Sequence, residues 1–279
     1  MALLLCLALS GCVEEEWDPA QTQQRGQFAA NKIQATLASA DLMIKQDASA
    51  QEISVQVHAY ADADAADIYC EGRDGTVWIE QRSGSSWGGH GRLEIDVTVP
   101  DKQLDTVDLY TASGDVELQG VAMRRGYIET ASGDADLTDV AAQELEIATV
   151  SGEQELVRIA AQVLEVHSTS GELTGRQVAT GTLTAHTTSG EMRWDDLAAQ
   201  TVEMQSVSGE LYAVFASSAQ HLQARMKSVS GDICCVVPQD LALRISANRT
   251  VDGGVHSDER AQNTLTLSTV SGSLKVQAR

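Results

Sequence analysis

The sequence has few aromatic residues, few prolines and few basic side chains. Only 4% of its 279 residues are Phe, Trp or Tyr, three are Pro, and 19 Lys and Arg stand against 40 Asp and Glu. A core with so few rings must be built from Val, Leu, Ile and Ala, which favours thin, strand-based packing. The formal net charge of −21 argues against nucleic acid as a partner, because phosphate neutralisation requires clustered Lys and Arg.

Long hydrophobic runs are also missing. The run Ala2–Leu9 has eight apolar residues, too few to span a bilayer as a helix but typical of the central region of a secretory signal. The segment Leu9-Ser10-Gly11-Cys12 resembles the bacterial lipobox, in which cleavage precedes a cysteine that receives lipid. The resemblance implies that residues 1–11 are a signal peptide and that Cys12 is lipidated. It also implies an exported protein held to the membrane by its N-terminal lipid, and Val13 after the cysteine favours the outer membrane.

The next segments differ in composition. Residues 12–29 are acidic and rich in Gln, which predicts a flexible tether because little apolar surface is available for packing. We expect residues 30–104 to form an irregular β cap. Residues 28–50 are ambiguous, because 28–44 has enough Ala, Leu and Met for a helix, whereas 53–57 alternates as a strand does. A stack of strands needs such a cap because its first strand otherwise exposes an unpaired edge.

The remainder of the chain repeats one motif, a Thr or Ser followed two residues later by Ser-Gly and then an acid. Its serine recurs at 19-residue steps, then at 22 to Ser230, at 22 to a degenerate copy at Asp252-Gly253, and at 19 to Ser271. The six regular positions are Ser113, Ser132, Ser151, Ser170, Ser189 and Ser208. A fixed period of this size indicates a repeat architecture. We therefore predict that residues 105–279 form an all-β, single-stranded β-solenoid of about nine 19-residue rungs.

Apolar residues within each repeat define the face that points inward. They lie six and four residues before the serine and three and five after it, as in Val107, Leu109, Val116 and Leu118. This is the two-residue period of a strand, shifted by one residue at the motif. We attribute the shift to the motif glycine, which tolerates positive φ. The hydroxyl residue two before the serine should form a ladder, with hydrogen bonds to its own kind and to turn backbone.

The acid after each motif glycine should form a column along the stack. Its members are Asp115, Asp134, Glu153, Glu172, Glu191, Glu210 and Asp232. In one interpretation these carboxylates accept turn N–H groups or extend into water. In the other they form a cation-binding or cationic-partner face, with Ca²⁺ the natural ion for oxygen ligands. The double-glycine Ca²⁺ repeat of other solenoids is not present.

Two histidines occupy equivalent positions of consecutive rungs. His167 and His186 lie three residues before their serines, next to Glu165 and Glu146 in the neighbouring outward column. Stacked imidazoles beside carboxylates could hold a transition metal, and the alternative is a solvated face.

Cysteine positions follow the same alternation. The pattern places Cys235 inward and Cys234 outward, and we expect no disulfide from Cys70 to either of them, because they lie on a distant rung.

Two serine patterns could suggest catalysis. Gly84-Ser85-Ser86-Trp87-Gly88, with His90 nearby, matches the G-x-S-x-G pattern, but that chemistry needs a strand-to-helix turn and no helical period follows. The motif serines recur on nearly every rung, whereas a nucleophile is a single residue placed against one base. We therefore assign no catalytic residue and expect a protein that is not an enzyme.

The repeated Leu-x-Leu-x-Thr-x-Ser-Gly-acid pattern, preceded by the segment 91–100, resembles the bacterial putative-adhesin family of β-strand-repeat domains. The resemblance covers roughly residues 35–279 and implies a β-solenoid without established catalytic residues. The leading hypothesis is a non-enzymatic, lipid-anchored envelope protein that presents a rigid acidic solenoid to an envelope protein or surface polymer. One alternative is a structural protein that self-associates through an exposed C-terminal edge at residues 271–279. Another is a polysaccharide-cleaving β-helix enzyme, for which the regular steps leave no room for groove-building loops.

Overall fold

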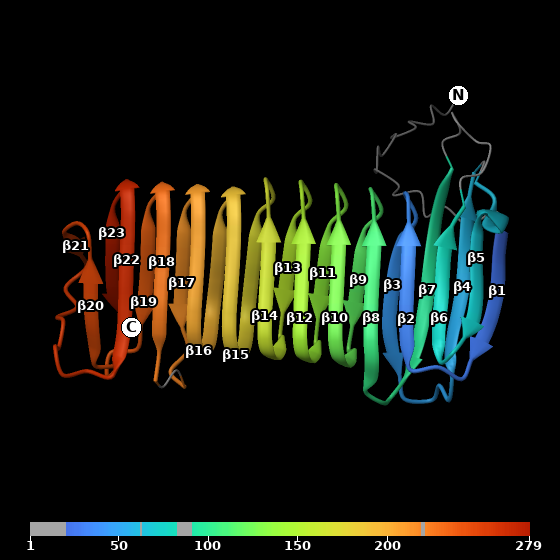
Figure 1. The fold of residues 1–279 in the computed structure, drawn as a ribbon, viewed down its shortest axis with the longest axis horizontal. Helices are drawn as coiled ribbons and strands as arrows, with labels where there is room; N and C mark the ends of the chain where they lie inside the picture. Colours follow the sequence, from blue (N-terminus) through green and yellow to red (C-terminus); the bar gives the residue numbers. More distant parts are fainter. Residues whose placement is uncertain (1–20, 62, 83–90, 219–220) are drawn as a thin grey trace, which may run out of the picture.

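The computed structural model describes residues 21–61, 63–82, 91–218 and 221–279. They form a stack of 23 strands in which the N-terminal strands lie at one end and the C-terminal strands at the other (Figure 1). One 3₁₀ turn, η1 (Ala65–Asp67), is the single helical element within these ranges. The prediction of an all-β solenoid is confirmed.

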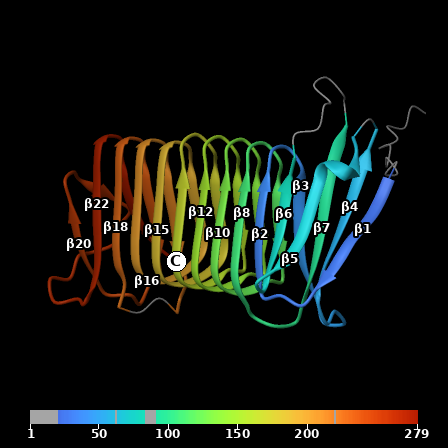
Figure 2. The same ribbon diagram turned by 45° about the vertical axis from the view of Figure 1, so that its right-hand side comes forward.

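Each rung contributes one strand to each of two stacks, and in Figure 2 one stack lies behind the other. The first stack, the long-strand face, runs in the order β5 (Ile68–Arg73), β6 (Thr76–Gln81), β2 (Lys32–Leu37), β8 (Leu104–Thr111), β10 (Ala122–Thr130), β12 (Ala141–Thr149), β14 (Ala160–Ser168), the second half of β15 (Leu173–Ser189), the second half of β16 (Met192–Ser208), β18 (Gln223–Ser230), β22 (Asn263–Ser271) and β20 (Leu243–Ala247).

The second stack, the short-strand face, runs in the order β1 (Gln21–Phe28), β4 (Ile53–Tyr60), β7 (Arg92–Pro100), β3 (Asp41–Asp47), β9 (Val116–Gln119), β11 (Ala135–Thr138), β13 (Gln154–Val157), the first halves of β15 and β16, β17 (Leu211–Phe215), β19 (Ile233–Val237), β23 (Leu274–Ala278) and β21 (Val251–Asp252).

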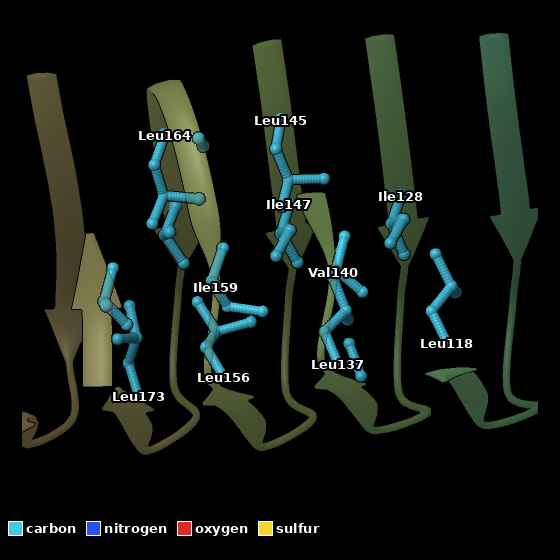
Figure 3. Close-up of a cluster of buried hydrophobic side chains, with 14 of the residues drawn as sticks. Leu118, Ile128, Leu137, Val140, Leu145, Ile147, Leu156, Ile159, Leu164 and Leu173 are labelled. Carbon is cyan, nitrogen blue, oxygen red and sulfur yellow. The ribbon is translucent and has the colours of Figure 1, made fainter. Parts of the chain in front are cut away.

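The core consists of columns of identical positions on successive rungs. Strand pairing joins residues 19 apart, so that Leu137 lies beside Leu118 and Leu156, and Ile128 beside Ile147. All five are at most 1% exposed, and Figure 3 shows such side chains filling the space between the two stacks. The predicted inward positions before and after the serine are confirmed.

The reason predicted for the motif glycine is wrong. Positive φ is not found at the motif glycines from Gly114 to Gly231; instead, each lies against the rung before it. A Cβ on Gly133 would lie 2.0 Å from the carbonyl oxygen of Gly114, so the residue is needed for close approach. The glycines that share this environment are Gly114, Gly133, Gly152, Gly171, Gly190, Gly209 and Gly231. Left-handed backbone occurs at the opposite corner, at Gly120, Asp139, Arg158, Gln177 and Asp196.

The parallel stack extends into the N-terminal region. Strands β2 and β3 form a rung that pairs with β8 and β9, and β6 and β7 form another beyond it. The antiparallel strands β1, β4 and β5 then end the stack. The predicted tether does not include residues 21–28, because their backbone pairs with β4 although most of their side chains are polar. The ambiguous stretch 28–50 contains the strands β2 and β3 and no helix, and its apolar residues pack into the same core.

The last two rungs are exchanged in space. Strand β22 pairs with β18, and β20, which precedes it in sequence, lies outside it. The expected terminal edge at residues 271–279 is therefore wrong in part, because β23 lies between β19 and β21, although β21 pairs with only Leu274 and Lys275 of β23. The true edge, β20, is covered: Ser257 Oγ accepts from Ile245 N–H at 2.9 Å, and Asp258 N–H donates to Leu243 O at 2.8 Å.

Side chains also close both ends of the motif corner. At the N-terminal end, Gln81 Oε1 accepts hydrogen bonds from the N–H groups of residues 38, 39 and 40 at 2.8, 2.8 and 3.0 Å. At the other end, Arg249 donates to the carbonyls of Val270 and Gly272. Consecutive corner N–H groups donate toward the N-terminal end, as Val150 and Ser151 do to the preceding rung. At the motif corner, N–H donors are therefore left without a rung partner at the N-terminal end of the stack, and carbonyl acceptors at the C-terminal end. Gln81 and Arg249 provide the matching partners.

Candidate functional site

The motif corner is a structural turn. Thr149 Oγ1 accepts a hydrogen bond from Gly152 N–H at 2.9 Å, and Thr111, Thr130 and Ser168 do the same on their rungs. These hydroxyl residues are buried, and the bonds run to turn backbone rather than along a ladder of hydroxyls. The motif serines are exposed, as Ser151 is.

The acids after the glycine form the predicted column on the short-strand face. Asp115 Oδ1 accepts a hydrogen bond from Asp134 N–H at 2.9 Å, and Asp134 Oδ1 accepts one from Glu153 N–H at 2.7 Å. Asp232 likewise accepts from Ser273 N–H at 2.7 Å, and this bond lowers the pKa of the carboxyl group. The glutamates are longer and exposed; they are Glu153, Glu172, Glu191 and Glu210.

A second column of carboxylates stands beside the first. Glu117, Asp136 and Glu155 lie two residues further along β9, β11 and β13 and pair with one another across these strands. Burial raises the pKa of Asp136, and the charges of Glu155 and Asp134 raise it further. We call the six carboxylates of these three rungs the acidic face: Asp115, Glu117, Asp134, Asp136, Glu153 and Glu155. Sequence reasoning missed the second column, although the 19-residue register already places it outward.

Basic side chains bound the acidic face along the stack. Arg92 pairs with Asp41 at 2.8 Å on the N-terminal side. On the C-terminal side Arg176 pairs with Glu155, and Arg193 lies 4.2 Å from the centre of the Tyr212 ring. Two shallow surface hollows lie on this face. One is lined by Asp134, Asp136, Glu153, Gln154, Glu155, Glu172, Thr174 and Arg176, and the other by Asp41, Leu42, Met43, Arg92, Glu94, Ile95, Asp96, Asp115, Val116, Glu117 and Asp136.

The predicted histidine pair lies on the long-strand face. The rings of His167 and His186 meet edge to face, with centroids 5.6 Å apart and an interplanar angle of 89°. Glu146 and Glu165 lie in the adjacent outward column of β12 and β14. Ligand atoms of Glu146, Glu165 and His167 all lie within 4.8 Å of one another. The structure therefore brings the ligand atoms of three of the four residues together, and His186 adjoins them through its ring contact with His167.

Cysteines and the remaining sequence motifs can be placed as far as the structure describes them. Cys235 is buried, Cys234 is half-buried, and Cys70, Cys234 and Cys235 are free thiols, as predicted. Burial raises the pKa of Cys70 to about 11. The lipobox with Cys12, and the segment Gly84–Gly88 with His90, lie outside the described residues. Within the described ranges no helix is long and apolar enough to cross a membrane.

The molecule is therefore a capped, two-faced β-solenoid whose short-strand face carries two adjacent columns of carboxylates. A family model described as Toastrack DUF4097 matches residues 30–277, and the chain belongs to that family. No curated protein matches the chain.

Solved structures share the fold at low identity. A putative lipid binding protein from Parabacteroides distasonis ATCC 8503 is 15% identical over 94% of this chain and 97% of its own, with a TM-score of 0.56. A putative adhesin from Bacteroides fragilis NCTC 9343 is 15% identical over 93% and 98%, with a TM-score of 0.47. A putative adhesin from P. distasonis ATCC 8503 is 12% identical over 93% and 96%, with a TM-score of 0.48. At these identities the first likeness supports the fold alone.

Proposed function

We propose that this protein is a non-enzymatic, lipid-anchored component of the cell envelope that presents the acidic face to a cationic partner in the manner of an adhesin. The observation that carries the proposal is the pair of carboxylate columns. Like charges on three adjacent rungs repel one another, and the pKa of Asp136 is raised first by burial and further by the charges of Glu155 and Asp134. A partner that brings positive charge relieves the repulsion, so binding and electrostatic relaxation are coupled.

A basic partner fits this face better than a single chelated ion. Among the described residues, the one group of three potential ligands whose atoms all lie within 4.8 Å of one another is on the long-strand face. The column aspartates are already engaged, because Asp115 and Asp134 each accept a backbone N–H. Ca²⁺ requires six to eight oxygen ligands around one point. We therefore propose a Lys- or Arg-bearing envelope protein, or an amine-bearing surface polymer, as the partner.

A role in presentation also agrees with the ends of the stack. Self-association end to end would need free strand edges, and the outward groups of Leu243 and Ile245 on β20 are already bonded to the loop at Ser257 and Asp258. At the other end the edge strands β1 and β5 each pair on one side, and β1 carries mostly polar side chains. Natural proteins protect edges in this way against aggregation. Anchoring through Cys12 would leave a rigid monomer attached at its N-terminal end.

Binding of poly-L-lysine to the soluble chain tests the acidic face. We expect the variant Asp115→Asn/Asp136→Asn/Glu155→Gln to weaken binding at least tenfold, and binding of the wild type to fall as salt rises. The matched control is Glu172→Gln/Glu191→Gln/Glu210→Gln, which removes the same amount of charge from the first column further along the stack. Equal losses in the two triple variants would contradict the proposal, because net charge alone would then explain the binding.

Lipid attachment is tested separately in cells. Metabolic labelling with palmitate should mark the full chain and fail to mark the Cys12→Ala variant, which should also leave the membrane fraction. A Cys12→Ala chain that stays labelled and membrane-bound would refute the anchor.

A further inference from the structure

We propose that the long-strand face holds a Zn²⁺ site in which Glu146, Glu165 and His167 are ligands and His186 completes the coordination. The inference stands apart from the acidic face, since these residues lie on β12, β14 and β15 of the other stack. It rests on the mixed chemistry of the cluster, its geometry and one buried atom without a partner.

The strand register brings the ligands together. Glu146 and Glu165 are direct neighbours on β12 and β14, and His167 follows Glu165 by two residues on the same side of the strand. The residue beside His167 on β12 is Ala148, whose small side chain leaves room for the imidazole. Three ligand atoms consequently lie within 4.8 Å of one another.

These separations suit a metal after small side-chain adjustments. Zn²⁺ binds imidazole nitrogen and carboxylate oxygen at about 2.0–2.2 Å in tetrahedral geometry, so its ligand atoms are about 3.4 Å apart. Closing the remaining distance requires rotation of long Glu side chains that are only half-buried. The strands themselves remain in place. One nitrogen and two oxygens favour Zn²⁺ over Ca²⁺, which prefers oxygen alone.

His186 supplies an independent indication. Its Nε2 atom is buried and has no hydrogen-bond partner, and a buried polar atom without a partner is costly. The ring stands edge to face against His167 at 5.6 Å between centroids, on the strand that follows β14. A metal ion between the two rings would give this nitrogen a partner, and the nitrogen would serve as the fourth ligand of the ion.

Zn²⁺ titration by calorimetry, on the full chain carrying Cys12→Ala, tests the site. We expect one Zn²⁺ per chain and a Kd at least tenfold weaker in His167→Gln and in Glu165→Gln. The matched controls are Glu144→Gln, an exposed acid two residues before Glu146 on β12, and His256→Gln, an exposed histidine of the C-terminal loop. Controls that bind as the wild type does would support the proposal. No stoichiometric binding, an unchanged Kd in His167→Gln, or an equal loss in the controls would overturn it.

Co²⁺ substitution tests the fourth ligand. A tetrahedral site gives an intense visible absorption band, and we expect His186→Gln to weaken that band while circular dichroism shows an intact fold. An unchanged band in His186→Gln would remove His186 from the ligand set. A wild-type spectrum typical of octahedral, water-ligated Co²⁺ would overturn the site as a whole.

Discussion

Replacing Gly152 by Ala tests whether the motif glycine is needed for close approach between rungs. The new Cβ would lie 1.9 Å from the carbonyl oxygen of Gly133 and 2.7 Å from its carbon. Relief requires the two rungs to separate by about 1 Å, in an interior that is close-packed and resists such shifts. The separation would stretch the bonds from Val150 N–H and Ser151 N–H to the rung before, which are now 3.2 and 3.0 Å long.

The cost can be estimated from these contacts. Overpacking contributes about 1–3 kcal/mol, and two weakened hydrogen bonds contribute about 1 kcal/mol each. We therefore expect Gly152→Ala to lower the free energy of unfolding by about 3–5 kcal/mol, a large part of the stability of an ordinary domain. Urea unfolding followed by circular dichroism measures it. The control Ser151→Ala, at the exposed neighbour, should change stability by less than about 0.5 kcal/mol.

A comparison with Gly120 separates space from backbone conformation. Gly120 has a φ of +69°, and a Cβ there would meet nothing closer than 3.6 Å. Asn tolerates left-handed backbone, so Gly120→Asn should be nearly neutral while Gly152→Asn is as damaging as Gly152→Ala. A loss below about 1 kcal/mol in Gly152→Ala, or rescue by Gly152→Asn, would refute the close-approach argument.

Three further predictions concern other parts of the stack. Gln81→Leu should cost about 1 kcal/mol, because three N–H groups, the Ala40 N–H among them part-buried, lose their acceptor, whereas Gln81→Glu keeps it and should stay near wild type in urea unfolding. Gly175→Leu should cost at least about 3 kcal/mol, since a Cβ there would lie 2.2 Å from Cε3 of the Trp194 ring; adding Trp194→Leu should recover most of it in a double-mutant cycle, and additive losses would contradict this. Asp136→Asn and Asp232→Asn should have opposite effects at pH 7. The raised pKa of Asp136 means that its charged form destabilises the fold above its unfolded pKa, so the first variant is more stable than wild type. The lowered pKa of Asp232 means that its charge stabilises the fold and that this contribution is lost as pH falls through the folded pKa, so the second variant is less stable. Both differences should shrink in urea unfolding below pH 3, and equal signs at pH 7 would refute the assignment.

The sequence was sufficient to predict the strand register because the motif repeats at a fixed interval of 19 residues. Residues 19 apart occupy equivalent positions and lie side by side when rungs pair in parallel. For that reason the core columns, the acid column and the histidine pair could be predicted. The rung formed by β2 and β3 escaped notice because Ala40 occupies the position of the motif glycine and the cap strands separate it from Ser113. The repeat pattern also does not predict the order in which the rungs stack in space. The exchange of β20 and β22 depends on a loop at residues 253–262 that lets the chain return.

The candidate sites were predicted less completely. The column Asp115, Asp134 and Glu153 follows from the motif, but its neighbours Glu117, Asp136 and Glu155 were overlooked because they are not part of it. Likewise, sequence gives His167 next to Glu165, but not the burial of His186 Nε2, which depends on how the rings pack. Side-chain burial and orientation arise from packing between rungs, and a period alone does not contain them.

Departures from the repeat indicate where function lies on such a scaffold. A solenoid built from identical rungs would present the same surface along its whole length, and the motif corner approaches this limit. The second carboxylate column, in contrast, occupies only β9, β11 and β13 and gives way to Thr174, Arg193 and Tyr212 on the following rungs. The imidazole pair occupies two rungs and gives way to Ala148 on one side and Gln205 on the other. Stacking alone does not require these local changes, because the neighbouring rungs pair equally well without them. The residues that interrupt the columns are therefore the first to mutate in a search for partners, ahead of the conspicuous serines.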